Sequence, residues 1–234
     1  MTSPQNSRFF VTGTDTNVGK TLVSAALLHL AAQSGLTAFG LKPVAAGCEH
    51  TPEGLRNRDA LLLQAHGSVK LPYEQINPFA LVSAKSPHIA AAEEKRRLSL
   101  DRIEGLCRGA LATRADLRLV EGAGGWRVPL NDRENMSALP QRLGLPVILV
   151  VGLRLGCLNH ALLTAQAIHF DGLRLAGWVA NQVDPNMESV RENIDTLKSR
   201  IPAPCIGEVP WLAEPTVETL AGYLWLGELL SSTG

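Results

Sequence analysis

The 234-residue sequence predicts an α/β fold, a doubly wound and mostly parallel sheet flanked by helices on both faces. Three observations support this. Short apolar runs are typical of fully buried strands, segments of helical length and spacing lie between them, and glycine or polar residues follow each run. No repeat, low-complexity tract or Ser/Gly linker divides residues 1–234, so we expect a single domain.

The predicted strands cover 8–12, 38–42, 117–121, 146–151, 173–181 and 205–209. The predicted helices cover 20–34, 101–113, 159–170 and 188–199. Strands that alternate with helices form right-handed βαβ units, and these give a parallel sheet. The least regular stretch, 47–97, is rich in proline, histidine and charge, and we expect it to form loops over a ligand. Its charge cluster 93–97 is expected to be a solvated surface turn.

Composition excludes several classes of protein. The 22 basic residues balance the 22 acidic ones, so no global field attracts nucleic acid or an anionic membrane, and any anion needs a local site. The N-terminus lacks a signal-peptide pattern, and the longest apolar run, 143–155, is too short to span a bilayer. The cysteines lack metal-site or disulfide spacing and are expected to be buried thiols: Cys48, Cys107, Cys157 and Cys205. We therefore expect a soluble, cytoplasmic protein.

The segment Gly13 to Thr21, GTDTNVGKT, has the context of a phosphate-binding loop, because it follows a predicted strand and opens a predicted helix. Its glycines let backbone N–H groups turn toward phosphate oxygens, and the helix N-terminus adds positive potential. In this interpretation Lys20 contacts the β- and γ-phosphates and the Thr21 hydroxyl binds Mg²⁺. Five residues separate Gly13 from Gly19, where a strict Walker A motif has four.

Other polar residues follow predicted strands, and ligands of parallel sheets bind beyond the carboxyl ends of the strands. Lys42 is either a solvated strand end or a second cation for the γ-phosphate. Glu121 stands where a Walker B acid is expected, although a turn or capping role is the alternative. Asp59 either binds the same Mg²⁺ or starts a helix. Asn181 either pairs with adenine or caps a turn.

Eight segments resemble the dethiobiotin synthetase family, and they run in order through nearly the whole chain. They are FVTGTDTNVGKT (10–21), KPVAAG (42–47), TPEGLRNRD (51–59), SPH (86–88), VEGAGGW (120–126), LGCLNH (155–160), VAN (179–181) and VPWL (209–212). The five-residue spacing of the phosphate loop is this family's own form. The resemblance implies a P-loop NTPase fold and an ATP-dependent cyclo-ligase of biotin biosynthesis. Such an enzyme closes a cyclic urea on 7,8-diaminononanoate with CO₂, through a carbamate that attacks the γ-phosphate.

The resemblance also implies roles for individual residues. Lys42 and Lys20 would be catalytic, and Thr21, Asp59 and Glu121 would bind magnesium. The implied ATP-binding residues are Asn17, Val18, Gly19, Lys20, Thr21, Leu22, Asp59, Glu121, Gly122, Ala123, Gly124, Asn181, Gln182, Pro210, Trp211, Leu212 and Glu214. The implied substrate-binding residues are Thr16, Lys42, Ala46, Gly124, Gly156, Cys157, Leu158 and Asn159. The last four would come from the partner subunit of a homodimer, with each site at the interface.

Two positions depart from the family pattern. Ala46 replaces a common hydroxyl residue, and Asn17 stands where an acid is frequent. One lost neutral hydrogen bond costs about 1 kcal/mol, or roughly fivefold in binding, and the Gly47 amide is a possible replacement donor. Two alternatives remain: a P-loop switch ATPase of the partitioning type, and a paralogous ligase with a related substrate. The first would carry a signature lysine early in the loop, but residues 14–18 contain none.

Overall fold

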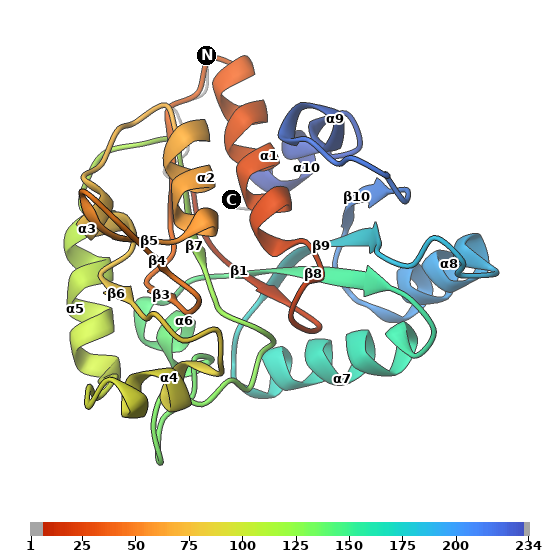
Figure 1. Ribbon diagram of the computed structural model, residues 1–234. Coiled ribbons are helices and arrows are strands. Elements are labelled where there is room, and N and C mark those ends of the chain that lie inside the picture. Colours follow the sequence, from red (N-terminus) through yellow and green to blue (C-terminus); the bar gives the residue numbers. More distant parts are fainter. Residues whose placement is uncertain (1–6, 232–234) are drawn as a thin grey trace.

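The computed structural model describes residues 7–231, and its centre is a six-stranded sheet in the order β10-β9-β8-β1-β7-β2. All neighbouring strands of this sheet run parallel (Figure 1). The strands are β1 (Ser7–Gly13), β2 (Ala38–Leu41), β7 (Leu117–Glu121), β8 (Val147–Leu153), β9 (Leu175–Gln182) and β10 (Cys205–Val209). All six predicted strands are confirmed, and the α/β class with them.

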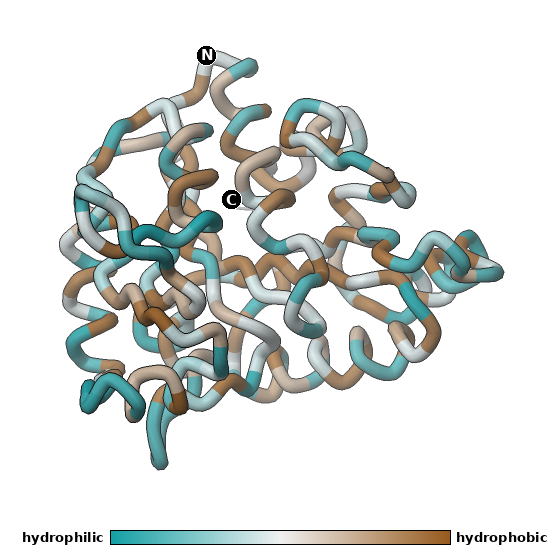
Figure 2. The backbone as a smooth tube through the Cα atoms, in the orientation of Figure 1, coloured by the Kyte–Doolittle hydropathy of each residue, from teal (hydrophilic) through white to brown (hydrophobic). Residues whose placement is uncertain are grey.

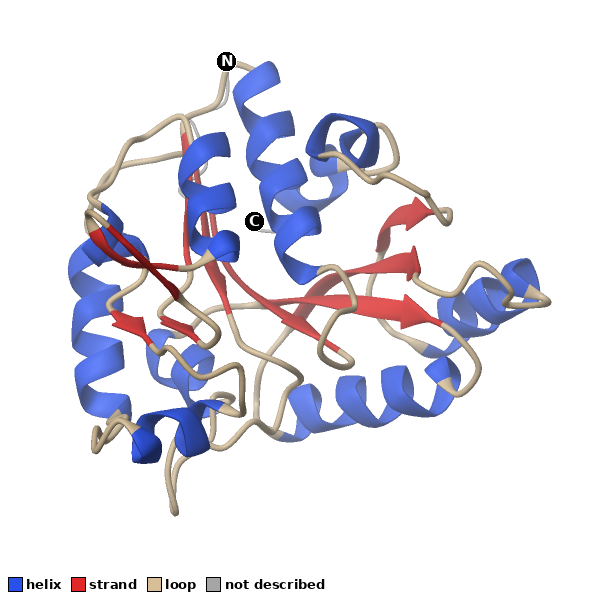
Figure 3. Cartoon of the chain, in the orientation of Figure 1, coloured by secondary structure: helices blue, strands red, loops and turns tan. Residues whose placement is uncertain are grey.

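Helices cover both faces of this sheet (Figure 3). One face packs against α1 (Lys20–Gln33), α9 (Val217–Ala221) and α10 (Leu226–Ser231). Residues of α5 (Leu100–Leu111) and α6 (Ala138–Leu143) pack in a second apolar cluster, and α7 (Cys157–Phe170) and α8 (Val190–Arg200) in a third. Most residues of the strands between these layers are apolar, as the brown segments in the middle of the tube show (Figure 2). The four predicted helices are confirmed to within three residues at each end.

The stretch 47–97 is more regular than the sequence indicates. It contains α2 (Arg58–His66), α3 (Tyr73–Ile76), α4 (Pro87–Glu93) and the antiparallel strands β4 (Glu49–Thr51) and β5 (Gly54–Arg56). Another short strand, β6 (Phe79–Ala80), pairs with β3 (Val44–Ala45). The expectation of loops over a ligand is therefore wrong for much of this stretch. Helix α2 forms because the Asn57 side chain caps it, accepting hydrogen bonds from Asp59 and Ala60.

The charge cluster 93–97 does form a turn, with Lys95 at a positive φ of 52°. This turn also makes hydrogen bonds to the end of β6 and to the segment that follows it. Arg96 Nη1 donates a hydrogen bond to the Ala80 carbonyl at 2.7 Å, and Glu94 Oε1 accepts one from the Val82 N–H at 2.7 Å. Its charged side chains are therefore partly structural.

The four cysteines are free thiols, three of them buried and Cys205 half-buried. Among residues 7–231, no helix combines the length and the apolar character needed to cross a membrane.

Candidate functional site

A cavity of about 970 Å³ opens at the carboxyl edge of the sheet, where β1, β2 and β7 end. Most of the phosphate loop lines it, together with residues that follow β2 and β7. The predicted site residues that line it are Thr16, Asn17, Gly19, Lys20, Thr21, Leu22, Lys42, Ala46, Asp59, Ala123 and Gly124. Glu121 and Gly122 lie directly beneath it, in contact with Lys42. The structure therefore brings together residues from four separate segments of the chain.

The phosphate loop turns through two residues with left-handed backbone. Asn17 has φ 58° and Gly19 has φ 91°, and both asparagine and glycine tolerate this region. A Cβ on Gly19 would lie 2.3 Å from Asn181 Nδ2, so no larger residue fits there. Helix α1 begins after Gly19 without a side-chain cap, which leaves its first N–H groups free of an intrahelical acceptor. This end of α1 lies on the cavity wall, and free N–H groups at a helix start can bind an anion.

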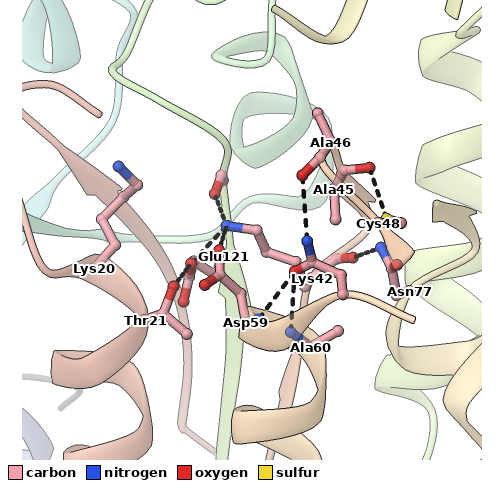
Figure 4. A network of polar contacts seen from close by, with 12 residues as sticks. Lys20, Thr21, Lys42, Ala45, Ala46, Cys48, Asp59, Ala60, Asn77 and Glu121 are labelled. Atoms are coloured by element: carbon pink, nitrogen blue, oxygen red, sulfur yellow. Dashed lines mark hydrogen bonds and ion pairs between the residues drawn. The ribbon is translucent and has the colours of Figure 1, made fainter. Parts of the chain in front are cut away.

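Lys42 is the centre of a charge cluster in which Lys42 and Glu121 are buried and Asp59 is half-buried (Figure 4). Its ammonium lies 2.6 Å from Glu121 Oε1 and 3.3 Å from Asp59 Oδ2, and it donates a third hydrogen bond to the Gly122 carbonyl. Burial opposes protonation of Lys42, but the carboxylates of Glu121 and Asp59 outweigh it and raise the pKa of this lysine. Lys42 is therefore a permanent cation, not a solvated strand end.

The oxygen atoms around Lys42 fit a divalent cation. The Thr21 hydroxyl donates a 2.7 Å hydrogen bond to Glu121 Oε1, and the Asp59 carboxylate is on the same side of the cavity. Glu121 Oε2 is fully buried and has no hydrogen-bond partner among the described residues. An unsatisfied buried carboxylate oxygen is costly unless something binds it. Two carboxylates and one hydroxyl are ligands that Mg²⁺ prefers.

Lys20 is the second cation of the site. Its ammonium donates a 2.8 Å hydrogen bond to the Asp15 carbonyl, within the phosphate loop itself. Burial first, and then repulsion by Lys42, lowers the pKa of Lys20 to about 8. A phosphate group beside Lys20 would supply the negative charge that the buried ammonium lacks.

A relay of buried hydrogen bonds joins Lys42 to the start of α2. The Asn77 side chain donates to the Lys42 carbonyl at 2.7 Å and accepts from the Tyr73 hydroxyl at 3.1 Å. That hydroxyl accepts a 2.6 Å hydrogen bond from the Asn57 N–H, and Asn57 caps the helix turn that carries Asp59. We did not single out any of these three polar residues from the sequence, although Asn57 before an acidic first turn is a readable helix-start signal.

The predicted adenine residues lie away from the charge cluster. Asn181 Nδ2 donates a 2.9 Å hydrogen bond to the Val18 carbonyl, so its amide supports the phosphate loop in this structure. The Gln182 side chain accepts from the Trp211 N–H at 3.3 Å. Pro210, Leu212 and Glu214 do not line the cavity, but Pro215, which the sequence interpretation omitted, does.

The predicted substrate residues Gly156, Cys157, Leu158 and Asn159 start α7 and do not line this cavity. Gly156 and Asn159 are exposed, and Leu155 beside them is 96% exposed. Within one chain, the structure does not bring these residues to the phosphate loop.

The two departures from the family pattern have local explanations. Asn17 suits the left-handed backbone at its position. Ala46 lines the cavity, and its carbonyl accepts a 3.2 Å hydrogen bond from Asn57 Nδ2. The Gly47 N–H donates to the Ser83 carbonyl at 3.2 Å, so the idea that this amide replaces a hydroxyl at position 46 is wrong.

The fold and the phosphate loop define a P-loop nucleotide-binding protein, and the sequence matches the family described as an AAA domain over residues 7–219. A structural likeness agrees with this class. The signal recognition particle receptor FtsY from Elizabethkingia anophelis has a TM-score of 0.50 at 16% identity, which supports the fold alone. The match covers 99% of this chain and 66% of that one, just under two thirds of its length.

Three relatives narrow the class, each of them an ATP-dependent dethiobiotin synthetase BioD. The protein of Cellvibrio japonicus is 57% identical over 96% of this chain and 98% of its own. The protein of Pseudomonas aeruginosa UCBPP-PA14 is 57% identical over 94% of this chain and 97% of its own. The protein of Xanthomonas euvesicatoria pv. vesicatoria is 50% identical over 88% of this chain and 92% of its own. The chain belongs to the dethiobiotin synthetase family.

Proposed function

We propose that this protein is an ATP-dependent dethiobiotin synthetase, a ligase that closes a cyclic urea on 7,8-diaminononanoate. The observation that carries the proposal is the convergence of Lys20, Lys42, Thr21, Asp59 and Glu121 on one cavity beside the phosphate loop. Ring closure of this kind requires ATP, a carbamate and a developing negative charge to be held together. The reaction needs no serine or cysteine nucleophile.

The reaction balances in three steps. One substrate amine adds to CO₂ and loses a proton, giving a carbamate. A carbamate oxygen attacks the γ-phosphorus and ADP leaves, giving a carbamic-phosphoric anhydride. The second amine attacks the carbamoyl carbon, phosphate leaves with the bonding electrons, and loss of a proton gives dethiobiotin. In-line transfer of this kind depends mainly on positioning and on stabilisation of charge.

In this proposal the lysines have different tasks. Lys42 is fixed by Glu121, Asp59 and the Gly122 carbonyl, so its charge needs no reorganisation when negative charge develops on the carbamate or phosphoryl oxygens. Lys20 is held by a single main-chain oxygen, and a bound phosphate would take over that hydrogen bond. The free N–H groups at the start of α1 would bind the remaining phosphate oxygens.

We further propose that Thr21, Asp59 and Glu121 bind Mg²⁺ with the nucleotide. The unsatisfied Glu121 Oε2 and the hydroxyl of Thr21 support this. When bound, the ion would neutralise phosphate charge. The adenine would lie toward Asn181, Gln182 and residues 210–215, where Pro215 is already on the cavity wall.

We propose a homodimer in which α7 of one chain approaches the cavity of the other. Helix α7 and the loop before it expose three large apolar side chains, Leu155 at 96%, Leu163 at 57% and Phe170 at 88%. Exposed apolar side chains on one helix are typical of a protein interface. The partner's residues 156–159 would then receive the substrate carboxylate. We place the enzyme in the cytoplasm, with no nucleic-acid or membrane partner.

The test is an assay of purified protein with ATP, Mg²⁺, bicarbonate and 7,8-diaminononanoate. We expect ADP release that depends on the diamine, together with dethiobiotin identified by mass spectrometry. Omission of bicarbonate under CO₂-free conditions is the matched control and should stop both. ATP hydrolysis that ignores the diamine but responds to DNA or lipid would refute the proposal and favour a switch ATPase.

A further inference from the structure

Three side chains that commonly bind transition metals meet at the end of α1 far from the phosphate loop. His29 lies in α1, nine residues and about 14 Å along the helix from Lys20. His66 is the last residue of α2, and Glu218 lies in the first turn of α9. Each offers one ligand atom, and these atoms all lie within 4.8 Å of one another. No part of the proposed ligase reaction uses them.

The two imidazoles are free to bind a ligand. Their ring centroids are 5.8 Å apart, with the planes at 70° in an edge-to-face contact. Within residues 7–231, neither ring takes part in a side-chain hydrogen bond or an ion pair. Both histidines are half-buried, so neither is closed off from solvent.

The charges around the cluster favour a cation. Hydrogen bonds from the Glu218 backbone and the Thr216 hydroxyl lower the pKa of Glu218, which keeps this side chain anionic. Burial lowers the pKa of His66, which favours the neutral ring that binds metals. Lys70 is the opposing cation, but its ammonium is held by the carbonyls of Gln64 and Ala65.

We propose that His29, His66 and Glu218 form a binding site for a transition-metal cation of the Zn²⁺ type, with water as the remaining ligand. Two imidazole nitrogens and one carboxylate oxygen are a common ligand set for such ions. Metal–nitrogen distances of about 2.0–2.1 Å require the three ligand atoms to draw closer together. Metal binding would therefore require rotation of Glu218, which is exposed, and of the two histidines.

Such an ion would join the three helices that carry parts of the ligase site. Helix α1 begins at the phosphate loop, α2 begins with the turn that carries Asp59, and α9 follows the segment with Pro215. The metal would therefore tie the C-terminal ends of α1 and α2 to the start of α9, which follows Pro215 on the cavity wall. We expect a bound ion to raise thermal stability without taking part in the reaction.

The experiment titrates the full chain with CoCl₂, without nucleotide and with excess MgCl₂, and follows visible absorption from the d electrons of Co²⁺. Mg²⁺ fills oxygen-rich sites but competes poorly for imidazole. We expect one equivalent of Co²⁺ to bind, and a melting temperature that rises with Zn²⁺. His29→Gln and His66→Gln should each weaken Co²⁺ binding at least about tenfold. His169→Gln, on the exposed face of α7, is the matched control and should bind like the parent.

Glu218→Gln is the variant that should fold like the parent, because this side chain is exposed and the change is nearly isosteric. It should also weaken Co²⁺ binding while circular dichroism remains that of the parent. The proposal is overturned if all three variants bind Co²⁺ like the parent, or if His169→Gln weakens binding equally. Neither result affects the ligase proposal, because diamine-dependent ADP release is measured separately and should survive all four substitutions.

Discussion

Helices α1 and α7 begin in the same way but in opposite surroundings. Each has 14 residues, each follows a strand of the central sheet, and each starts after a left-handed glycine with no side-chain cap. Gly19 has φ 91° and Gly156 has φ 93°. A Cβ on Gly19 would meet the Asn181 amide at 2.3 Å, whereas one on Gly156 would meet nothing within 4 Å.

The same backbone geometry at the start of a helix therefore does not by itself make a binding site, because the surrounding side chains differ. Both helix ends have free N–H groups, but only the start of α1 is surrounded by buried lysines, carboxylates and a supporting asparagine from the same chain. The start of α7 faces outward beside the exposed Leu155. A helix end of this kind becomes a complete binding site only when a second molecule covers it, which is why a dimer is the natural proposal.

The largest expected effect comes from Lys42→Ala, which removes the central charge beside α1. We expect turnover to fall about 10²- to 10³-fold, because the fixed cation no longer stabilises the transition state. ATP affinity should change less than about tenfold, since Lys20 and the helix N–H groups remain. Steady-state kinetics and calorimetric titration with a non-hydrolysable ATP analogue measure the two quantities.

Lys198→Ala is the control for Lys42→Ala, because Lys198 forms an ion pair with Glu208 outside the nucleotide cavity. It should leave turnover unchanged. If Lys42→Ala retained full turnover, Lys42 would have no part in the reaction.

The second prediction compares Gly19→Ala with Gly156→Ala. Both substitutions place an alanine in left-handed backbone, which costs about 1–2 kcal/mol. Only Gly19→Ala also collides with Asn181, so it should weaken ATP binding about tenfold or more. Denaturation and nucleotide titration of both variants give the comparison. Equal loss of ATP affinity in the two would show that the Asn181 contact does not matter.

The third prediction concerns the apolar surface of α7. If this surface pairs with a second copy, Phe170→Gln should weaken dimerisation about tenfold or more, because a large aromatic surface loses its cover. Analytical ultracentrifugation measures the dissociation constant. Leu106→Gln on α5, where the exposed fraction is 44%, is the matched control. A monomeric parent protein would contradict the interface outright.

The smallest effect is a pH dependence of stability caused by Lys20. The pKa of this lysine is about 8 in the folded chain and takes its ordinary value of 10.5 after unfolding. Below pH 8 both states hold the proton, and the folded chain bears the full cost of the buried charge. Between these values the folded chain has lost a proton that the unfolded chain keeps, so stability rises with pH.

Urea unfolding of nucleotide-free protein at pH 7.5 and 9.5 measures this effect of Lys20. Lys20→Met is the reference, because its side chain is neutral at both values. The parent should gain about 1 kcal/mol or more relative to Lys20→Met. Lys42 contributes no difference, since its raised pKa keeps it protonated throughout. A constant difference between the two proteins would show that Lys20 is not destabilised by burial.

The sequence was most informative where one residue type has one physical role. Buried strands such as 146–151 are runs of apolar residues, and GTDTNVGKT identifies the phosphate loop through its glycines and lysine. Glu121 and Lys42 follow strands whose ends meet in a parallel sheet, so their convergence could be expected. Asn181 was also expected near the nucleotide, but the hydrogen bond of its amide to the loop depends on β9 lying two strands from β1.

Other features depend on contacts between distant segments, which no local pattern encodes. Helix α2 was not among the predicted helices, although a helix start at Asp59 was one alternative, because its cap, Asn57, stands in a stretch whose charge and proline content favour loops. Pro215 reaches the cavity only because α9 packs against α1. The strand order could not be derived either, since it requires knowledge of which side of the sheet each crossover takes.

The hydroxyl oxygen of Tyr73 connects the segments that carry Lys42 and Asp59. Its hydroxyl joins the Asn77 amide, which holds the Lys42 backbone, to the Asn57 N–H at the start of the helix that carries Asp59. Lys42 and Asp59 are therefore aligned by a shared internal scaffold, although Tyr73 does not line the cavity. A residue that does not line the cavity thus holds two of its charged groups in place, and we expect substitutions of Tyr73 to lower turnover more than ATP affinity.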